Sequence, residues 1–119
     1  MADNGLGAME ARFADIIWES EPVSSTELVR RAEQELGWKK STTYTVLKRL
    51  AARGLFSNEN GTVRALVSRR DYYAERSERF VEESFSGSLP AFVTAFTERK
   101  KLSSGEIDEL QRLIDKMRG

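Results

Sequence analysis

The chain has 119 residues, of which 39% are hydrophobic and 32% charged, and it contains neither cysteine nor histidine. A chain of this length holds one compact core, or one small domain and an arm that needs a partner. The missing residue types exclude disulfides, Cys/His zinc sites and catalytic schemes built on those side chains. Carboxylate pairs with catalytic or metal-ligand spacing, glycine-rich phosphate loops and GxSxG are also missing, so we expect no enzyme, metal or cofactor.

The sequence has no apolar run that approaches membrane-spanning length. Its first ten residues, MADNGLGAME, lack the basic and apolar regions of a signal peptide. We therefore expect a cytoplasmic protein that does not insert into a membrane.

The first two predicted helices carry apolar residues at helical spacing. The first runs from about residue 6 to residue 20 and ends at Glu21-Pro22, because a residue before proline is disfavoured in a helix. Ser24 to Glu27 reads as a capping box, in which Ser24 accepts from the Glu27 amide and Glu27 reaches back. A second helix of about eleven residues follows, and Gly37 ends it.

The third predicted helix, residues 41–54, has two different faces. Its apolar face is formed by Thr43, Val46, Leu47 and Leu50, and its polar face by Ser41, the expected N-cap, with Tyr44, Thr45 and Lys48. Hydroxyls, a phenol and an ammonium group are side chains that reach base edges and phosphates from a helix in a DNA major groove. The alternative is an ordinary amphipathic helix with a solvated polar face.

Charge is segregated along a chain whose net charge is zero. Residues 1–37 carry three Lys/Arg and eight Asp/Glu, residues 38–70 carry eight and one, and residues 71–119 carry eight and ten. The middle segment, which contains the third helix, is therefore strongly basic. A local basic surface can bind a polyanion even when the whole chain is neutral. A solvated basic surface without a partner is the alternative.

A hairpin is predicted directly after the third helix. Two short strands, residues 55–57 and 62–68, flank Asn58-Glu59-Asn60-Gly61, and Asn-Gly supplies the positive φ angles of a tight turn. Three helices followed by a hairpin is the element order of a winged helix-turn-helix. Arg64 in the second strand, and Arg69 and Arg70 beyond it, would then flank the DNA backbone.

The remainder of the chain, residues 71–119, reads as amphipathic helices without strands. One helix ends near Phe85, the next carries Pro90 in its first turn, and Ser103 to Glu106 forms a second capping box before the last helix. These stripes exceed what so small a region buries alone, so a homodimer interface is the economical explanation. Packing back on residues 1–70 as a monomer is the alternative.

Residues across both halves carry a resemblance to a known family. They are Ile17-Trp18, Pro22, Glu27, Thr42, Thr45, Leu47, Arg49-Leu50, Gly54-Leu55, Phe96, Leu102-Ser103, Glu106, Leu110 and Ile114. Over nearly its full length the chain resembles the penicillinase-repressor family of winged-helix transcription factors, the BlaI and MecI type. The implied fold is mainly α with a small β-hairpin: an N-terminal winged helix-turn-helix DNA-binding domain, residues 1–70, and a C-terminal helical dimerisation region, residues 71–119.

The resemblance implies a homodimeric repressor in which each winged helix reads half of a pseudo-palindromic operator in double-stranded DNA. The implied DNA-binding residues are Lys40, Ser41, Thr42, Tyr44, Thr45, Lys48, Arg53 and Arg64, with Tyr44 and Thr45 on bases and Lys40, Lys48, Arg53 and Arg64 on phosphates. Arg49 either joins them or braces an acidic residue of the first or second helix. The implied dimerisation residues are Phe80, Phe85, Leu89, Phe92, Val93, Phe96, Ile107, Leu110 and Ile114.

The resemblance also bears on how repression ends. Antibiotic-responsive members are cut at an Asn-Phe bond through a membrane-bound metalloprotease sensor pathway. The matching bond here is Ala95–Phe96, which keeps the Phe but not the Asn. Copper-responsive relatives use a C-terminal cysteine cluster, which this chain lacks.

Two other functions are compatible with the sequence. The basic face could meet an acidic protein, in which case the winged helix is a protein-interaction module whose binding does not depend on operator sequence. Alternatively, a ligand-gated regulator would use Phe80, Phe85, Phe92 and Phe96 to line a small-molecule pocket, although such a stripe is more often core or interface.

Overall fold

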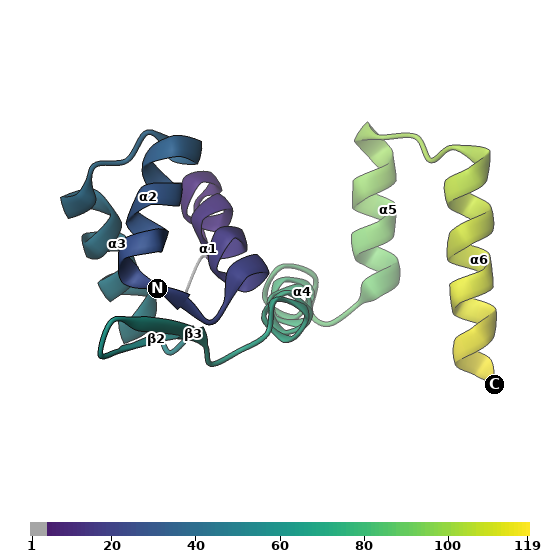
Figure 1. Cartoon of the computed structure of the whole chain (residues 1–119). Coiled ribbons are helices and arrows are strands. Elements are labelled where there is room, and N and C mark those ends of the chain that lie inside the picture. The colour runs from purple at the N-terminus through teal and green to yellow at the C-terminus, as the bar shows by residue number, and fades with distance from the viewer. Residues whose placement is uncertain (1–4) are drawn as a thin grey trace. The chain divides into compact units, whose positions relative to one another are not determined.

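The computed structural model describes residues 5–119 as a mainly helical chain with a small antiparallel sheet, which confirms the predicted fold class (Figure 1). The elements in order are α1 (Ala8–Ser20), β1 (Val23–Ser24), α2 (Ser25–Leu36), α3 (Lys40–Ala52), β2 (Phe56–Glu59), β3 (Thr62–Ala65), α4 (Arg69–Phe85), α5 (Leu89–Arg99) and α6 (Ser104–Arg118). No helix within residues 5–119 is long and apolar enough to cross a bilayer. The chain divides into two compact units, here called the N-terminal unit, up to Arg76, and the C-terminal unit, Ser77–Gly119.

Local signals explain where α1 and α2 begin and end. The Ser24 hydroxyl accepts a hydrogen bond from the Glu27 amide at 3.0 Å, as predicted for the N-cap of α2. The Glu27 carboxylate accepts from the Arg30 guanidinium, so an ion pair takes the place of the predicted return bond. Gly37 ends α2 in the left-handed region, with φ of 70°, as expected for a residue without a Cβ.

The prediction that Ser41 caps α3 is wrong. The helix begins at Lys40, and Lys39 occupies the N-cap position without a side-chain hydrogen bond. The Thr43 amide already donates to the Lys39 carbonyl at 3.0 Å, so helical hydrogen bonding starts before the serine. The first turn of α3 therefore has no side-chain acceptor at its N-cap.

The sheet has the order β1-β3-β2, with all neighbours antiparallel. The predicted hairpin is confirmed: Asn60 and Gly61 have φ of 53° and 80° at the turn between β2 and β3. Strand β1 was not predicted, because two residues are too few for a periodic pattern to show. It forms because Val23 pairs with Val63 in the middle of the hairpin.

The core of the N-terminal unit lies between α1, α2, α3 and the sheet. Its largest fully buried side chains come from every one of these layers: Phe13, Ile17, Leu28, Leu50, Phe56 and Val63. The buried positions of α3 are the four of the predicted apolar face. This core therefore fixes which side of α3 remains exposed.

The first two turns of α4 belong to the N-terminal unit. The Trp18 indole N–H donates to the Val67 carbonyl at 2.9 Å, just before the helix starts. The Arg69 guanidinium donates to Asp15 of α1 at 2.8 Å and lies 4.8 Å from the centre of the Tyr73 ring. Arg69 was expected to flank the DNA backbone, but its guanidinium is engaged with α1.

The C-terminal unit is built from capped helices. The turn after α4 uses positive φ at Ser86 and Gly87, of 52° and 81°. Both bonds of the predicted second capping box are present, with Ser103 accepting from the Glu106 amide and the Glu106 carboxylate accepting from the Ser103 amide. Neither α5 nor α6 contains a buried residue.

Candidate nucleic-acid interface

Helix α3 presents a continuous polar face to solvent. Lys40, Ser41, Thr42, Thr45 and Lys48 are exposed, and Tyr44 is half-buried with its ring against the core. The opposite face is buried, so the predicted division of the helix into a docked side and a free side is confirmed. Six of the eight predicted DNA-binding residues thus share one surface, which we call the α3 face.

Hydrogen bonding decides what Thr45 offers on this face. Its hydroxyl donates to the Ser41 carbonyl one turn earlier, at 2.9 Å. While that bond holds, the hydroxyl can accept but cannot donate. Thr45 is therefore suited to a base that presents a donor.

The N-terminus of α3 adds positive potential to the same surface. Its first amides have no side-chain acceptor at the N-cap, and Lys39 and Lys40 beside them are exposed. Free amides at a helix N-terminus and the helix dipole attract phosphate groups. This end of the helix is suited to an anionic partner.

Strand β2 borders one edge of the α3 face. A surface depression of about 360 Å³ lies between the helix and the strand, lined by Tyr44, Leu47, Lys48, Ala51 and Asn58. Asn58 was not predicted as a site residue. It lies two residues after the buried Phe56, so strand alternation turns both side chains towards the helices. That spacing was the available signal.

Arg64, the predicted wing contact, is exposed on the other side of the sheet. It is paired with Ser57 in the register of the hairpin, whereas Asn58 pairs with the buried Val63. Directly paired residues share a face of an antiparallel sheet. The wing therefore has two faces, one with Arg64 and one with Asn58, and only the second adjoins the depression beside α3.

The N-terminal segment borders the opposite edge of the α3 face. The Arg49 guanidinium donates to the Glu10 carboxylate of α1 at 2.8 Å, and the second Glu10 oxygen accepts from the Gly7 amide at 3.2 Å. Partial burial opposes ionisation of Glu10, but these two hydrogen bonds and the charge of Arg49 hold the pKa of the carboxyl below its ordinary value. Of the two alternatives for Arg49, a DNA contact or an ion pair with an acidic residue of the first or second helix, the structure therefore shows the ion pair.

Arg53 lies further along this same edge. Its guanidinium donates to the Gly5 carbonyl at 3.4 Å, and the side chain is half-buried. Its charge is one of the influences that lower the pKa of Glu10. Arg53 thus lies at the margin of the α3 face, next to the N-terminal segment.

A second candidate surface lies on the C-terminal unit, where large apolar side chains are exposed. Their exposed fractions range from 40% to 76%; the residues are Phe80, Leu89, Val93, Phe96, Ile107, Leu110, Leu113, Ile114 and Met117. Of the nine predicted dimerisation residues, only Phe85 and Phe92 are half-buried rather than exposed. A monomer rarely leaves so many large apolar side chains of one small unit exposed to water.

The phenylalanine side chains of this unit contact one another. The ring centres of Phe80, Phe85, Phe92 and Phe96 lie 5.6 to 6.1 Å apart in successive pairs, mostly edge to face. The four rings thus form one aromatic cluster. A small-molecule pocket among these four residues, the ligand-gated alternative, finds no support in this arrangement.

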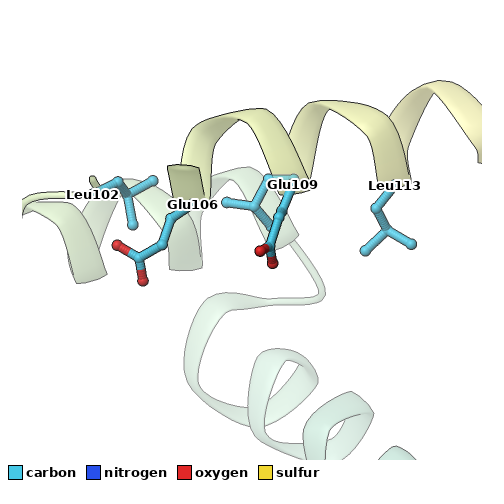
Figure 2. Close-up of a pocket in the computed structure, with 5 residues that line it drawn as sticks. Leu102, Glu106, Glu109 and Leu113 are labelled. Atoms are coloured by element: carbon cyan, nitrogen blue, oxygen red, sulfur yellow. The ribbon is translucent and has the colours of Figure 1, made fainter. Parts of the chain in front are cut away.

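Helix α6 continues the exposed surface. Figure 2 shows Leu102, Glu106, Glu109 and Leu113 directed to one side of the helix, where with Leu110 they line a shallow depression. An apolar patch with a polar rim is the general arrangement of a protein–protein interface. In residues 5–119 no group of three Asp or Glu is arranged to hold a metal ion.

Three helices followed by a β-hairpin, with the exposed polar face on the third helix, define a winged helix-turn-helix protein. A family model described as penicillinase repressor matches residues 6–116. The chain therefore belongs to the penicillinase repressor family, which consists of transcriptional regulators and not of enzymes. Both the predicted family and the predicted lack of enzymatic activity are confirmed.

Individual relatives are distant in sequence but matched over most of their length. The methicillin resistance regulatory protein MecI of Staphylococcus aureus strain Mu50 is 24% identical over 115 residues, which cover 93% of this chain and 94% of that protein. The penicillinase repressor of Bacillus licheniformis is 26% identical over 110 residues, which cover 89% of this chain and 86% of that protein.

Proposed function

We propose that this transcriptional regulator is a cytoplasmic homodimeric repressor that binds a pseudo-palindromic operator in double-stranded DNA. The observation that carries the proposal is the α3 face, where lysine, hydroxyl and phenol groups are held outward by a fully packed core. Family membership supports it, because the matched relatives are named as repressors or resistance regulators. Residues up to about 70 then bind DNA, and the helices after them hold two copies together.

Each group on the α3 face has an assigned role in this proposal. Tyr44 and Thr45 contact base edges, with Ser41 and Thr42 beside them, because they lie at the centre of the exposed polar surface. Lys40 and Lys48 contact phosphates, as does Arg64 from the outer face of the wing. Arg53 contributes least, since its guanidinium is directed towards the N-terminal segment.

The second copy is proposed from the exposed apolar surface of the C-terminal unit. Burying one leucine- or phenylalanine-sized side chain contributes about 1.5–3 kcal/mol. Nine large apolar side chains of the C-terminal unit and α4 remain at least 40% exposed, and α5 and α6 have no buried residue at all. Pairing with an identical surface removes this area from water, and a twofold dimer matches a palindromic site.

Fluorescence anisotropy tests the proposal directly. The purified protein is titrated with DNA from upstream of its own gene and with a scrambled duplex, each across a salt series. We expect the native duplex to bind about a thousandfold more tightly, and log affinity to fall linearly with log salt. Equal binding of the two duplexes would contradict operator recognition and favour a general or protein-facing basic surface.

A matched pair of lysine variants assigns the contacts. Lys48→Ala removes a charge from the α3 face, and Lys116→Ala removes the same charge from the exposed end of α6. We expect Lys48→Ala to weaken both duplexes and to reduce the salt slope by about one, because one phosphate contact is lost. Lys116→Ala should leave the slope unchanged.

Derepression is proposed to follow proteolysis at Ala95–Phe96 or another loss of the dimer, with a membrane-bound metalloprotease sensor pathway as the upstream partner. Both residues are exposed in α5, whose residues are nowhere buried in a single copy of the chain, so local opening of this helix in a dissociated copy disrupts little packing. A cut there separates α6 and the end of α5 from the rest of the chain. Operator affinity then falls on the order of a hundredfold, because two half-site contacts are no longer linked.

The test is the length of the chain during induction. Immunoblots and mass spectrometry across an induction time course should show a fragment ending at Ala95 as reporter expression rises. Intact protein that persists at full induction would rule out proteolysis and leave regulated dimer dissociation.

A further inference from the structure

We propose that Asn58 and Lys48, beside the ring of Tyr44, form a site for one sugar–phosphate unit of the DNA backbone, so that strand β2 and helix α3 hold the same DNA strand. The proposal rests on the DNA binding proposed above. It adds a contact on the helix-facing side of the wing, where no DNA-binding residue was predicted.

The geometry comes from the depression between α3 and β2. Leu47 and Ala51 form an apolar floor, and Tyr44, Lys48 and Asn58 place polar groups around it. Tyr44, Lys48 and Ala51 follow one another at spacings of four and three residues along one edge of the helix. The depression is therefore a continuous border of the α3 face, and a strand lying on that face would pass over it.

The chemistry of the lining fits a deoxyribose and its phosphate. A lysine ammonium has three donors and an asparagine amide has two, so both groups can donate to the same anionic oxygens, and the Tyr44 phenol stays available for a base edge. The deoxyribose ring is largely apolar and suits the leucine and alanine floor. No carboxylate lines the depression to repel a phosphate.

Strand alternation singles out Asn58 from its neighbours. Phe56 on the same side of β2 is buried in the core, and Val63, which pairs with Asn58 across the hairpin, is buried too. Ser57 is one residue earlier and lies on the other side of the sheet with Arg64. The Ser57→Ala variant is thus a matched control, because Ser57 is next to Asn58 in β2 but faces the opposite side of the sheet.

Phosphate ethylation interference on the upstream duplex is the decisive experiment, because it needs no known operator. Phosphates whose ethylation blocks binding are mapped for the wild-type protein and for Asn58→Ala, Lys48→Ala and Ser57→Ala. We expect Asn58→Ala and Lys48→Ala to lose interference at the same phosphate in each half-site, and Ser57→Ala to keep every position. Asn58→Ala should also weaken native and scrambled duplexes alike, by about tenfold for a hydrogen bond to a charged group.

The outcomes separate this site from the proposed function. An unchanged interference pattern for Asn58→Ala would overturn the site. A loss of affinity for the native duplex alone would also overturn it, because that result indicates a contact with a base. Failure of the wild-type protein to prefer the native duplex would overturn operator recognition instead. In that case the affinities still test the site, because Asn58→Ala should weaken both duplexes and Ser57→Ala should not, and equal affinity of Asn58→Ala and wild type would overturn it. Circular dichroism melts confirm that each variant is folded.

Discussion

The two units of this chain solve the problem of burying apolar surface in different ways. In the N-terminal unit, side chains from α1, α2, α3 and the sheet enclose one another, and Phe13, Leu50 and Val63 have no exposed surface. In the C-terminal unit, α5 and α6 present Val93, Leu110 and similar residues to solvent at 40% or more. The N-terminal unit buries its apolar side chains within one copy of the chain. The C-terminal unit instead exposes apolar side chains of the kind that obligate dimers bury in their interface.

The largest expected effect comes from a substitution that creates a cavity in the core of the N-terminal unit. Leu50→Ala should lower the free energy of unfolding by about 2–5 kcal/mol, because a fully buried leucine leaves a cavity. Urea unfolding followed by tryptophan fluorescence measures it. Leu110→Ala, the matched change at a 42% exposed position, should leave this transition nearly unchanged. Similar losses for both variants would contradict the difference between the units.

The next largest effect tests the exposed apolar surface of the C-terminal unit. Leu110→Asp should convert the proposed dimer into monomers and lower operator affinity on the order of a hundredfold, because an aspartate in a buried interface loses its hydration. Sedimentation equilibrium and anisotropy measure the two changes. Arg112→Asp introduces the same residue on the opposite side of α6 and should remain a dimer. A dimer that survives Leu110→Asp would place the interface elsewhere.

A smaller effect concerns the ion pair between Glu10 of α1 and Arg49 of α3, here called the brace. Glu10→Gln should cost up to about 1 kcal/mol at neutral pH, the usual scale for a partly exposed ion pair. Because the pKa of Glu10 is held below its ordinary 4.5, the brace stabilises the protein above that pH and its contribution disappears as the pH falls through the lowered pKa. Thermal melts from pH 7 to pH 3 should therefore converge for the two proteins. Glu33→Gln, at an exposed site of α2, is the matched control.

The smallest effect lies at the start of α6. Ser103→Ala removes the hydroxyl that accepts from the Glu106 amide and should cost about 1 kcal/mol of local stability. Amide hydrogen exchange in α6 should quicken about fivefold, while the N-terminal unit exchanges as before. Ser104→Ala, one residue later, is the control. Equal acceleration in both units would indicate that they unfold together.

The parts of the fold that follow from local chemistry were predictable from the sequence. Apolar spacing located the helices. Gly37 located the end of α2, Asn60-Gly61 located the hairpin turn, and Ser103 with Glu106 located the start of α6. Strand β1 was not predictable, because its two residues pair with Val63 and Thr62, far away in the chain. A separation of 39 residues likewise hid the partner of Arg49, since Glu10 reaches it only after α1 and α3 have packed.

The candidate site shows the same limit. The exposed face of α3 followed from helical spacing alone, since the core uses its other side. Asn58 was overlooked because the four-residue stretch from Asn58 to Gly61 reads as a turn, whereas β2 continues to Glu59 and only Asn60 and Gly61 form the turn. Extending the strand by two residues changes Asn58 from a loop residue into one with a defined face. The register of the hairpin, rather than its existence, was the missing information.

The Trp18 indole, hydrogen-bonded to Val67 and surrounded by aromatic rings, also has an optical consequence. Both tryptophans and all three tyrosines of the chain precede residue 77, so absorbance at about 280 nm and the tryptophan and tyrosine fluorescence originate in the N-terminal unit. Dissociation or cleavage in the C-terminal unit would be spectroscopically silent unless it disturbed the core. A single tryptophan placed at Phe92 would give the second unit a signal of its own, and the two halves of the molecule could then be followed separately in one cuvette.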